Sequence, residues 1–521
     1  MKRAIVCHPF IFAIYSVLGV YSQNSVQVPV QWVVRPLVVL LFLVALLYFA
    51  LRRKNGDPQY TGLIISLGIF WFFFGHFHRA LFEKSPFWGT TLGILLAFSI
   101  WTIPIAFLVS KWTWGQISNR GLVTNIMNFS AVIVVLLPAY ATGNTLIQAI
   151  KQTRSYENLR IPVVLEQKDK QPDIYLIILD AYGRDDFLRD VYGFDNSDFI
   201  GYLKQKGFYV ADSGTANYPQ TLLSLSALLN MEYLDELTID FRNTDARGPV
   251  VNLVQHSNVR RSLKNIGYDF VALPSATLST QMRDADLYVA LTAGDLNEFE
   301  GLLLSSTVIN LLIDAWDMSV PVPSYDLHRR YILFSLEKLE TMPTVKGPKF
   351  VFSHIMAPHP PFVLDGQGDP IQPQRPFNTG DASGFMGTSE EYISGYTGEI
   401  HYLNNRLIKV IDIILDESSP PPIIIIQGDH GPGNYFNMIE PVNSCLKERY
   451  SILSAYYFPD KNYEELYPTI TPVNSFREVF NQYFGADLKL LEDRNYYATW
   501  LEPYIFSDVS DQVQSCYISS E

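Results

Sequence analysis

The chain has 521 residues, 48% of them hydrophobic, and a formal net charge of −13 at pH 7, so it is too long for one ordinary domain. Residues 1–150 hold ten Lys and Arg against two acids, which gives +8 and leaves −21 for the remainder. This acidic balance argues against nucleic acid as a partner, because nucleic-acid binding needs a basic surface. The composition predicts a hydrophobic, mildly basic N-terminal part joined to a soluble, acidic C-terminal part.

Five apolar segments occur before residue 145, and each reaches or approaches the ~20 residues that cross a bilayer core. They cover about 4–21, 32–51, 61–78, 88–110 and 121–142. Basic residues of the short connections fall mainly on alternate ends, with seven on one side: Lys2, Arg3, Arg52, Arg53, Lys54, Lys111 and Arg120. The positive-inside rule therefore predicts a multi-pass membrane protein with a cytoplasmic N-terminus and everything after residue 142 outside.

The rest of the chain has the pattern of an α/β domain. We predict an interfacial helix and a linker for residues 143–171, and the soluble domain for residues 172–521. Its strand candidates are 174–179, 207–211, 268–272, 349–354, 422–427 and 452–458. Helix candidates alternate with them at 196–206, 221–231, 248–266, 325–340, 390–416, 460–466 and 473–483. This alternation predicts a mainly parallel sheet with helices on both faces.

The first predicted strand ends at Asp180, in IILDAYGRDD. Ligands of open α/β sheets bind just beyond the carboxyl ends of the strands, so this carboxylate is a candidate metal ligand. The alternative is that Asp180 caps the next helix. Arg184, four residues further on, is a candidate for substrate binding.

Thr221 opens an apolar helix after the turn Tyr218-Pro219-Gln220. A hydroxyl at a helix N-terminus can be a cap, or a nucleophile that the helix dipole and a metal help to activate. Ser224 and Ser226, on the following turns, are expected to pack or to support the site.

The segment KFVFSHIMAPHPPF, 349–362, contributes two histidines. His354 closes a strand, and His359 sits in a proline-rich loop where its ring can project, so we assign both to substrate binding. The following 365–388 is long and rich in Gly, Pro and Asp. Loops of this length in compact domains are usually lids or binding loops.

The central element is PPPIIIIQGDHGPG, 420–433, whose four isoleucines predict a strand buried on both faces. Asp429 and His430 follow it between glycines that allow close backbone approach. An acidic oxygen next to an imidazole suits zinc or manganese. The alternative is a turn with a hydrogen-bonded Asp and a surface His.

These motifs, taken in order, resemble the sulfatase-like branch of the alkaline phosphatase superfamily over about residues 172–480. The segment TLLSLSALLN, 221–230, is similar to the sulfatase nucleophile motif C-x-P-S-R-x-x-L-L-T, with Thr221 at the cysteine and Ser224 at the serine. Residues 392–415 resemble the helix that precedes the Asp-His-Gly strand in that branch. The chain departs from sulfatases in its Thr, in lacking the motif's Pro and Arg, and in having one carboxylate, Asp180, where sulfatases have two.

Threonine, a single acidic ligand and five spans before an external catalytic domain instead resemble lipoteichoic acid synthases and phosphoethanolamine transferases, which have Glu where this chain has Asp180. The resemblance implies one divalent metal, zinc or manganese with magnesium or calcium as alternatives. Its ligands would be Asp180, Thr221, Asp429 and His430, with Thr221 as nucleophile and His359 contacting phosphate.

The expected function is a phosphotransferase on the outer face of a bacterial plasma membrane, which moves a phospholipid head group through Thr221 to an envelope glycan or lipid. One alternative is a sulfatase-like hydrolase of phosphate or sulfate esters, and another is an inactive envelope scaffold or sensor. Cys445 and Cys516 are the two cysteines outside the membrane region, and an external compartment is oxidising, so we predict a disulfide between them, with two separate thiols as the alternative. The sequence does not indicate an oligomeric state.

Overall fold

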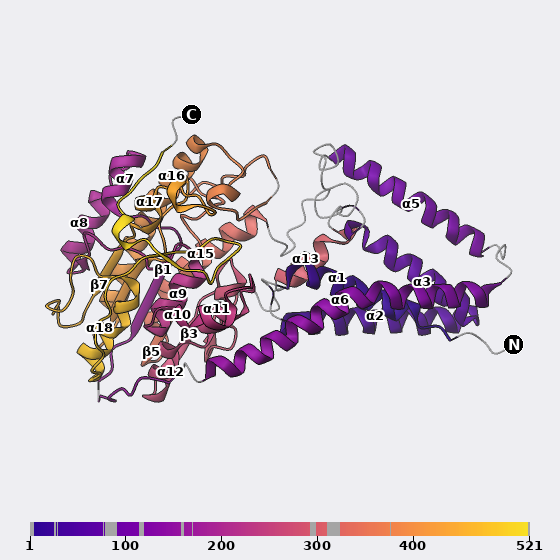
Figure 1. The fold of residues 1–521 in the computed structure, drawn as a ribbon, viewed down its shortest axis with the longest axis horizontal. Coiled ribbons are helices and arrows are strands. Elements are labelled where there is room, and N and C mark those ends of the chain that lie inside the picture. Colours follow the sequence, from indigo (N-terminus) through magenta and orange to yellow (C-terminus); the bar gives the residue numbers. More distant parts are fainter. Residues whose placement is uncertain are drawn as a thin grey trace. The chain divides into compact units, whose positions relative to one another are not determined.

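The computed structural model divides the chain into two compact units, shown with their elements in Figure 1. Unit 1 comprises 1–152 and 296–323, and unit 2 comprises 153–295 and 324–521. The structure describes residues 5–25, 28, 30–76, 78, 91–113, 119–157, 161–168, 170–291, 298–309, 324–375 and 377–518. Parts of the predicted spans (4, 77 and 88–90) and of the predicted linker (158–160 and 169) lie outside these residues.

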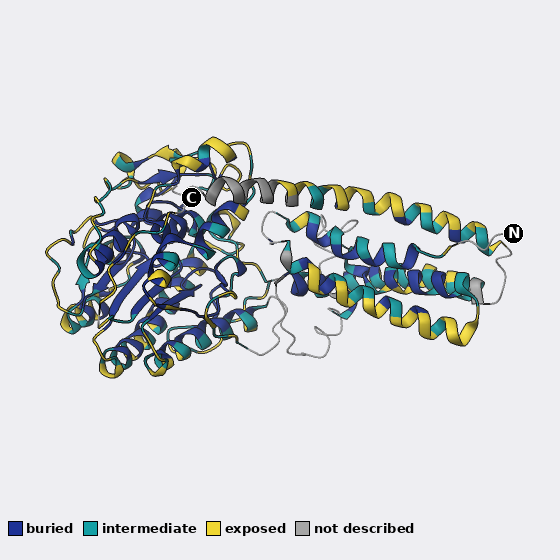
Figure 2. Cartoon of the chain, turned by 90° about the horizontal axis from the view of Figure 1, so that it is seen from below, coloured by how far each residue is buried: buried dark blue, intermediate teal, exposed yellow. Residues whose placement is uncertain are grey.

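Unit 1 is helical. Its helices are α1 (His8–Asn24), α2 (Gln31–Asn55), α3 (Pro58–Phe72), α5 (Thr91–Thr113), α6 (Arg120–Glu157, which continues into unit 2) and α13 (Glu298–Ser305). Among the described residues, three helices are long and apolar enough to cross a membrane: Trp32–Asn55, Leu92–Lys111 and Arg120–Asn144. These helices are largely exposed along their length (Figure 2).

The prediction of five spans is therefore wrong by this criterion, because α1 and α3 are shorter than their apolar segments. α1 has 17 residues and α3 has 15, or about 25 and 22 Å at 1.5 Å per residue, against a hydrocarbon core of about 30 Å. Asp57 caps the start of α3 by accepting the N–H groups of Gln59 and Tyr60, and Phe73 leaves the helical conformation at its end. Both helices pack against α2 and each other.

Two features of unit 1 were not predicted. Residues 143–157, predicted as an interfacial helix, continue α6 without a break. The chain also returns from unit 2 to unit 1, where α13 packs Phe299 and Leu303 into the core formed by α1 and α2. An ion pair between Arg35 of α2 and Glu300 fixes this return.

Unit 2 contains a seven-stranded sheet in the order β2-β7-β6-β1-β5-β3-β4. The strands are β1 (Ile174–Leu179), β2 (Tyr209–Val210), β3 (Asp269–Ala272), β4 (Leu287–Tyr288), β5 (Lys349–Ile355), β6 (Ile423–Gly428) and β7 (Ser454–Tyr457). β1 lies between β5 and β6 and is parallel to both, whereas β7 is antiparallel to β6 and to β2. The predicted α/β fold with a mainly parallel sheet is confirmed.

Two hydrophobic cores cover the two faces of this sheet, because side chains alternate along each strand. Tyr175, Ile177 and Leu179 of β1 join one core with α7 (Asp185–Tyr192), α8 (Ser197–Lys206), α15 (Tyr325–Thr341) and α16 (Ser389–Glu417). The residues between them join the other core with α9 (Thr221–Asn230), α11 (Gly248–Gln255), α12 (Asn258–Asn265) and α18 (Pro472–Phe484). Buried strands accordingly occupy the middle of the unit in Figure 2.

The differences from the predicted elements are local. The predicted helix 248–266 is two helices, because His256 leaves the helical conformation and Ser257 caps α12. The predicted helix 460–466 is wrong: this stretch forms turns. The short α10 (Asp235–Phe241) and α17 (Leu446–Tyr450) were not predicted, nor was a second, two-stranded sheet of β8 (Tyr496–Tyr497) and β9 (Ser507–Asp508).

Cys445 and Cys516 form a disulfide, as predicted. Cys445 immediately precedes α17, and the flanking backbone is paired as well, since the Lys447 N–H donates to the Ser515 carbonyl over 3.0 Å. The bridge therefore fastens the C-terminal segment to the short helix that follows the Asp-His-Gly loop.

Candidate metal centre

Three predicted ligands meet at the carboxyl edge of the sheet. Asp180 follows β1 and Asp429 follows β6, and these parallel neighbours end in register, with Leu179 opposite Gly428. Ligand atoms of Asp180, Asp429 and His430 all lie within 4.8 Å of one another, and all three residues are buried. The parallel pairing of two buried strands thus brings together carboxylates 249 positions apart in the sequence, as the two motifs predict.

The backbone around the two carboxylates is specialised. Ala181 has a φ of 65°, in the left-handed region that non-glycine residues rarely adopt, and its N–H donates to Asp429 Oδ1 over 3.0 Å. A Cβ on Gly431 would lie 2.0 Å from the Glu448 carbonyl oxygen, so only glycine fits there. Asp180 does not cap the next helix, since α7 begins after Arg184.

The donor set fits a divalent cation. Asp180 Oδ1 and Asp429 Oδ2 are buried and have no hydrogen-bond partner among the described residues, and they lie 3.6 and 3.4 Å from His430 Nε2. Buried carboxylates without partners are costly, and a cation between them removes that cost. His430 Nδ1 lies 2.9 Å from the Gly431 carbonyl, which places the proton on Nδ1 and the lone pair on Nε2. Two carboxylates and an imidazole suit zinc or manganese.

Thr221 is the first residue of α9, as predicted, and its Oγ1 lies 3.2 Å from His430 Nε2. Its hydroxyl therefore faces the same space as the unpartnered carboxylate oxygens. Ser224 supports the arrangement, since its hydroxyl donates to the Asp429 carbonyl over 2.6 Å. Ser226 bonds the Val250 carbonyl instead and has no described contact with the cluster.

The two predicted substrate histidines both lie beside Asp180 or His430. His354 Nε2 is 3.2 Å from Asp180 Oδ2, while its Nδ1 is held by Thr280 Oγ1 at 2.8 Å. His354 is fully buried, so its ring contacts Asp180 rather than facing an open site. The ring of His359 lies 6.2 Å from that of His430, with Nδ1 held 2.6 Å from the Pro360 carbonyl.

Arg184 is directed elsewhere. Its guanidinium donates to Asp186 Oδ1 over 2.6 Å and to the Gly214 carbonyl over 2.8 Å. No contact among the described residues links Arg184 to the cluster. The structure therefore brings together every predicted site residue except this one.

Two residues of the site were not identified from the sequence. Arg449 of α17 is buried, and its Nη2 lies 3.3 Å from His430 Nε2. Asp381, from the loop predicted as a lid, pairs with Arg449 and accepts a 2.7 Å hydrogen bond from the Tyr392 hydroxyl. The only sequence signal for Asp381 was the length and composition of its loop, and Arg449 sits in a short helix without a pattern.

The pKa shifts favour ionised Asp180 and Asp381 side chains and a neutral His430 imidazole. Burial alone would raise the pKa of Asp180, but His359, His354 and His430 outweigh it and lower that pKa. Burial, together with the charge of Arg449, lowers the pKa of His430 below the usual 6.5. Burial opposes ionisation of Asp381, but Arg449 chiefly holds its pKa at about 2. A neutral His430 beside an ionised Asp180 is the state that binds a metal.

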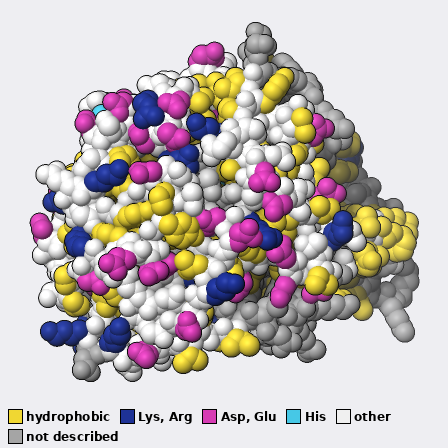
Figure 3. Space-filling model, turned by 60° about the vertical axis from the view of Figure 1, so that its left-hand side comes forward, with side chains coloured by type: hydrophobic (Ala, Val, Ile, Leu, Met, Phe, Trp, Pro, Cys, Tyr) yellow, Lys and Arg dark blue, Asp and Glu magenta, His cyan; other side chains and the backbone are white. Residues whose placement is uncertain are grey.

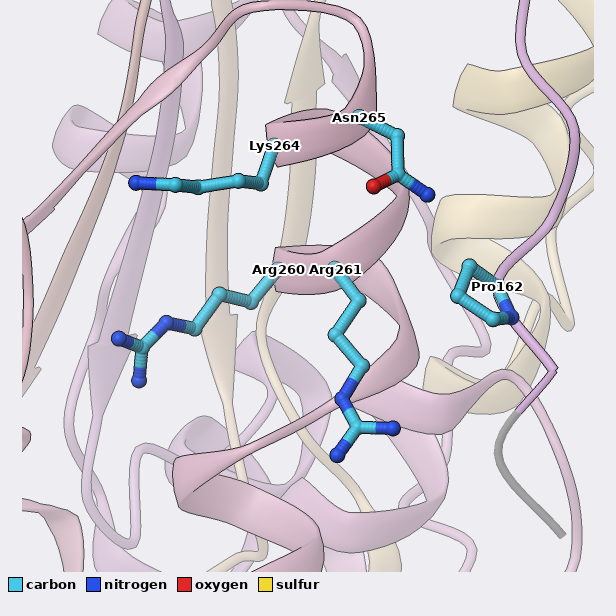
Figure 4. A pocket seen from close by; sticks show the side chains of 5 residues that line it. All are labelled: Pro162, Arg260, Arg261, Lys264 and Asn265. Carbon is cyan, nitrogen blue, oxygen red and sulfur yellow. The ribbon is translucent and has the colours of Figure 1, made fainter. Parts of the chain in front are cut away.

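A pocket elsewhere in unit 2 has a different character. Its lining residues are Pro162, Arg260, Arg261, Lys264 and Asn265 (Figure 4). All of them except Pro162 belong to α12, which precedes β3. Arg260 and Lys264 are neutralised by Asp284 and Asp286. On the face shown in Figure 3, acidic and basic side chains are likewise interspersed.

A scan of protein-family models found no match, and no curated protein matched the sequence. Solved structures do match. The chain is similar to the zinc complex of the C-terminal periplasmic domain of EptC from Escherichia coli, at 12% identity and a TM-score of 0.44, over 68% of this chain and 97% of that one.

Two further matches are the lipooligosaccharide phosphoethanolamine transferase EptA of Neisseria meningitidis and the phosphonate monoester hydrolase of Agrobacterium radiobacter. EptA is 11% identical with a TM-score of 0.36, over 89% of this chain and 90% of that one. The hydrolase is 13% identical with a TM-score of 0.40, over 63% and 80%. The phosphoethanolamine transferases are of the kind that the sequence motifs resemble, but at this similarity none of these proteins assigns an activity to the chain.

Proposed function

We propose that the chain is a membrane-anchored, metal-dependent phosphotransferase that moves a phospholipid head group through Thr221 to an envelope acceptor. One observation carries the proposal: the Thr221 hydroxyl lies 3.2 Å from His430 Nε2, beside two buried carboxylate oxygens without hydrogen-bond partners. Asp180, Asp429 and His430 would hold the cation together with Thr221. When bound, the cation would lower the pKa of the Thr221 hydroxyl and offset charge on phosphate oxygens.

The residues of the chain define the first half of the reaction. The Thr221 oxygen forms a bond to phosphorus while the bond from phosphorus to the glycerol oxygen of the lipid breaks. The proton lost from Thr221 balances the proton gained by that glycerol oxygen, so diacylglycerol leaves and a phosphothreonine diester remains. In the second half, an acceptor hydroxyl displaces Thr221 and restores its proton. The N-terminus of α9 favours the anionic oxygen in both halves.

Apolar side chains around the site support a lipid donor. Three segments meet next to the cluster, since Ala382, Phe436 and Tyr497 pack in one hydrophobic core and Tyr497 bonds the Asn437 carbonyl over 2.7 Å. Each segment also exposes large apolar side chains, namely Met386, Ile439, Val442, Trp500 and Leu501. Exposed apolar residues on these three segments suit a substrate that has acyl chains next to a charged head group.

Release of diacylglycerol from phospholipid vesicles tests the proposal. We expect the full-length protein in vesicles to release diacylglycerol only with a divalent metal, and Thr221→Ala to abolish the release. Ser226→Ala is the matched control, because that hydroxyl bonds Val250 outside the cluster. Metal-dependent release of diacylglycerol by Thr221→Ala would contradict the assignment of Thr221 as the nucleophile.

The same assay separates the alternatives. A hydrolase continues to release diacylglycerol with water as the acceptor, whereas a transferase stops after about one equivalent until an acceptor hydroxyl is added. A scaffold or sensor binds metal without any release.

A further inference from the structure

Arg449 is held on three sides in the interior of unit 2. Its Nε donates to the Pro219 carbonyl over 2.8 Å, and its Nη1 donates to the Gly431 carbonyl over 3.1 Å and to Asp381. Its guanidinium also lies over the Phe436 ring, 5.2 Å from the centroid. These contacts leave Nη2 as the part of the guanidinium that faces the metal centre.

Nη2 has a partner there only while His430 carries no cation. Nη2 donates to His430 Nε2 over 3.3 Å, and the same nitrogen lies 3.2 Å from Thr221 Oγ1. A metal ion would take the Nε2 lone pair and remove this acceptor. Arginine does not deprotonate in proteins, so a buried Nη2 would then need another hydrogen-bond acceptor close to Thr221.

We propose that Arg449 binds a non-bridging oxygen of the phosphate group that reacts with Thr221, and that Asp381 is a positioning residue for Arg449. This inference rests on the proposed function, because it takes the phosphate of that reaction as the ligand. A planar guanidinium whose other donors are already fixed is well suited to bind a tetrahedral oxyanion. His359, whose ring lies 6.2 Å from that of His430, approaches the same space.

Asp381 connects this contact to the long loop at 365–388. Its Oδ1 accepts from the Tyr392 hydroxyl over 2.7 Å and its Oδ2 accepts from Arg449. A Cβ on Gly433 would lie 2.7 Å from Asp381 Oδ2, so a larger residue there would displace the Asp381 carboxylate. The loop therefore aligns Arg449 when Asp381 is in place, which gives it a role beyond covering the site.

Binding of two soluble probes, inorganic phosphate and glycerophosphoethanolamine, tests the proposal without turnover. Each is titrated into the zinc-loaded full-length Thr221→Ala protein, which cannot form the covalent adduct. When Arg449→Gln is introduced into this Thr221→Ala protein, we expect the affinity for the probes to fall about tenfold or more, as for loss of a charged hydrogen bond. The zinc content should not change. The probe that binds more tightly distinguishes free phosphate from a head-group ester.

Three further variants make the test specific. Asp381→Asn should weaken probe binding less than Arg449→Gln, and Arg449→Lys should give an intermediate loss, because it keeps the charge without the fork. Arg477→Gln is the matched control: Arg477 is also buried and bonded to carbonyls, of Met231 and Lys489, outside the centre. Its probe binding should not change.

The proposal is overturned if Arg449→Gln binds both probes as tightly as its parent, or if the zinc-loaded parent binds neither. If Arg449→Gln does not fold, unchanged binding by Arg449→Lys overturns it instead. A loss of probe binding in Arg449→Gln supports the proposal even if the native protein forms no adduct on Thr221. The missing adduct would contradict only the assignment of Thr221 as the nucleophile.

Discussion

At the scale of single residues, the proposed chemistry depends on carboxylates that are buried but not satisfied. In the described part of the chain, Asp180 Oδ1 and Asp429 Oδ2 have no hydrogen-bond partner and face one imidazole nitrogen. Such an arrangement is unfavourable without a cation, because like charges in a poorly solvated space repel. Metal binding should therefore depend on these two acids, whereas chemistry should depend on Thr221.

Asp429→Asn and Thr221→Ala should separate these two roles. The amide neutralises less cation charge, so we expect Asp429→Asn to lose metal affinity by more than the roughly tenfold typical of an outer-sphere partner. Thr221→Ala should retain most of its metal but lose turnover. Metal content of the two purified proteins, measured by mass spectrometry after dialysis against limiting zinc, checks this. Equal metal loss in both would show that Thr221 is chiefly a ligand.

Asp180, Thr221, Asp429 and His430 could be predicted because each lies directly at the end of a strand or the start of a helix with a strong pattern. Arg449 and Asp381 could not, because they come from a five-residue helix and an irregular loop whose positions depend on tertiary packing. Arg184 shows the opposite effect. It follows a predicted ligand in the sequence, yet the turn after β1 directs its side chain to Asp186 and Gly214.

At the scale of elements, α16 supports the segment that carries His359. Glu399 of this helix is buried and accepts hydrogen bonds from the backbone N–H groups of Val363 and Leu364. Burial raises the pKa of Glu399 to about 8, against an ordinary value of 4.5. The folded protein therefore keeps this proton over a pH range in which the unfolded chain releases it.

This difference predicts a pH dependence of stability. Between about pH 5 and 8 Glu399 stays protonated in the native state and ionises in the unfolded chain, so its contribution to the free energy of unfolding should fall as the pH rises. Glu399→Gln cannot titrate and should reduce this fall, although Glu448, with its pKa also raised to about 8, keeps part of it. Urea unfolding of the full-length protein at several pH values measures the slope. An identical slope in both proteins would contradict the assignment of Glu399.

The disulfide gives a second prediction for an element. Cys445 and Cys516 are 71 positions apart, and closing a loop of that size typically stabilises the native state by about 2–4 kcal/mol. Cys516→Ser should lower the melting temperature and make it insensitive to reductant, whereas the parent should respond to reductant. The parent and variant melting at the same temperature without reductant would exclude a stabilising bridge.

The central strands could be predicted because unbroken β-branched runs mark fully buried parallel strands. The predicted helix 460–466 failed because its residues make other contacts: the Tyr463 hydroxyl donates to the Gly207 carbonyl, and Asp460 accepts the Asn462 N–H. Similarly, the membrane segments could be located from hydropathy. The lengths of α1 and α3, however, depend on the residues that cap and terminate each helix, and hydropathy does not predict these.

At the scale of the whole molecule, unit 1 gathers basic residues at one end of its helices. Arg120 at the start of α6 pairs with Asp57 at 2.5 Å, and Asp57 lies just beyond Arg52, Arg53 and Lys54 in the last turn of α2. α6 carries the chain away from this end toward unit 2. The positive-inside rule therefore still predicts that this end is cytoplasmic and unit 2 external.

A reporter of compartment tests this orientation. Alkaline phosphatase activity from a fusion after residue 171 should appear only if that point is external, and a fusion after residue 56 should be inactive. The reverse pattern would place the proposed metal centre in the cytoplasm and contradict access to lipids of the outer face.

The central claim is that Thr221 carries the transferred group, and mass spectrometry of the Thr221 peptide tests it most directly. The full-length protein is incubated with zinc and with vesicles of phosphatidylethanolamine and phosphatidylglycerol in the absence of an acceptor. It is then digested into peptides. We predict that the peptide gains the mass of one phosphate-bearing head group on Thr221, and that Asp429→Asn shows no such gain. Release of diacylglycerol with an unmodified Thr221, or with the added mass on another residue, would contradict the account.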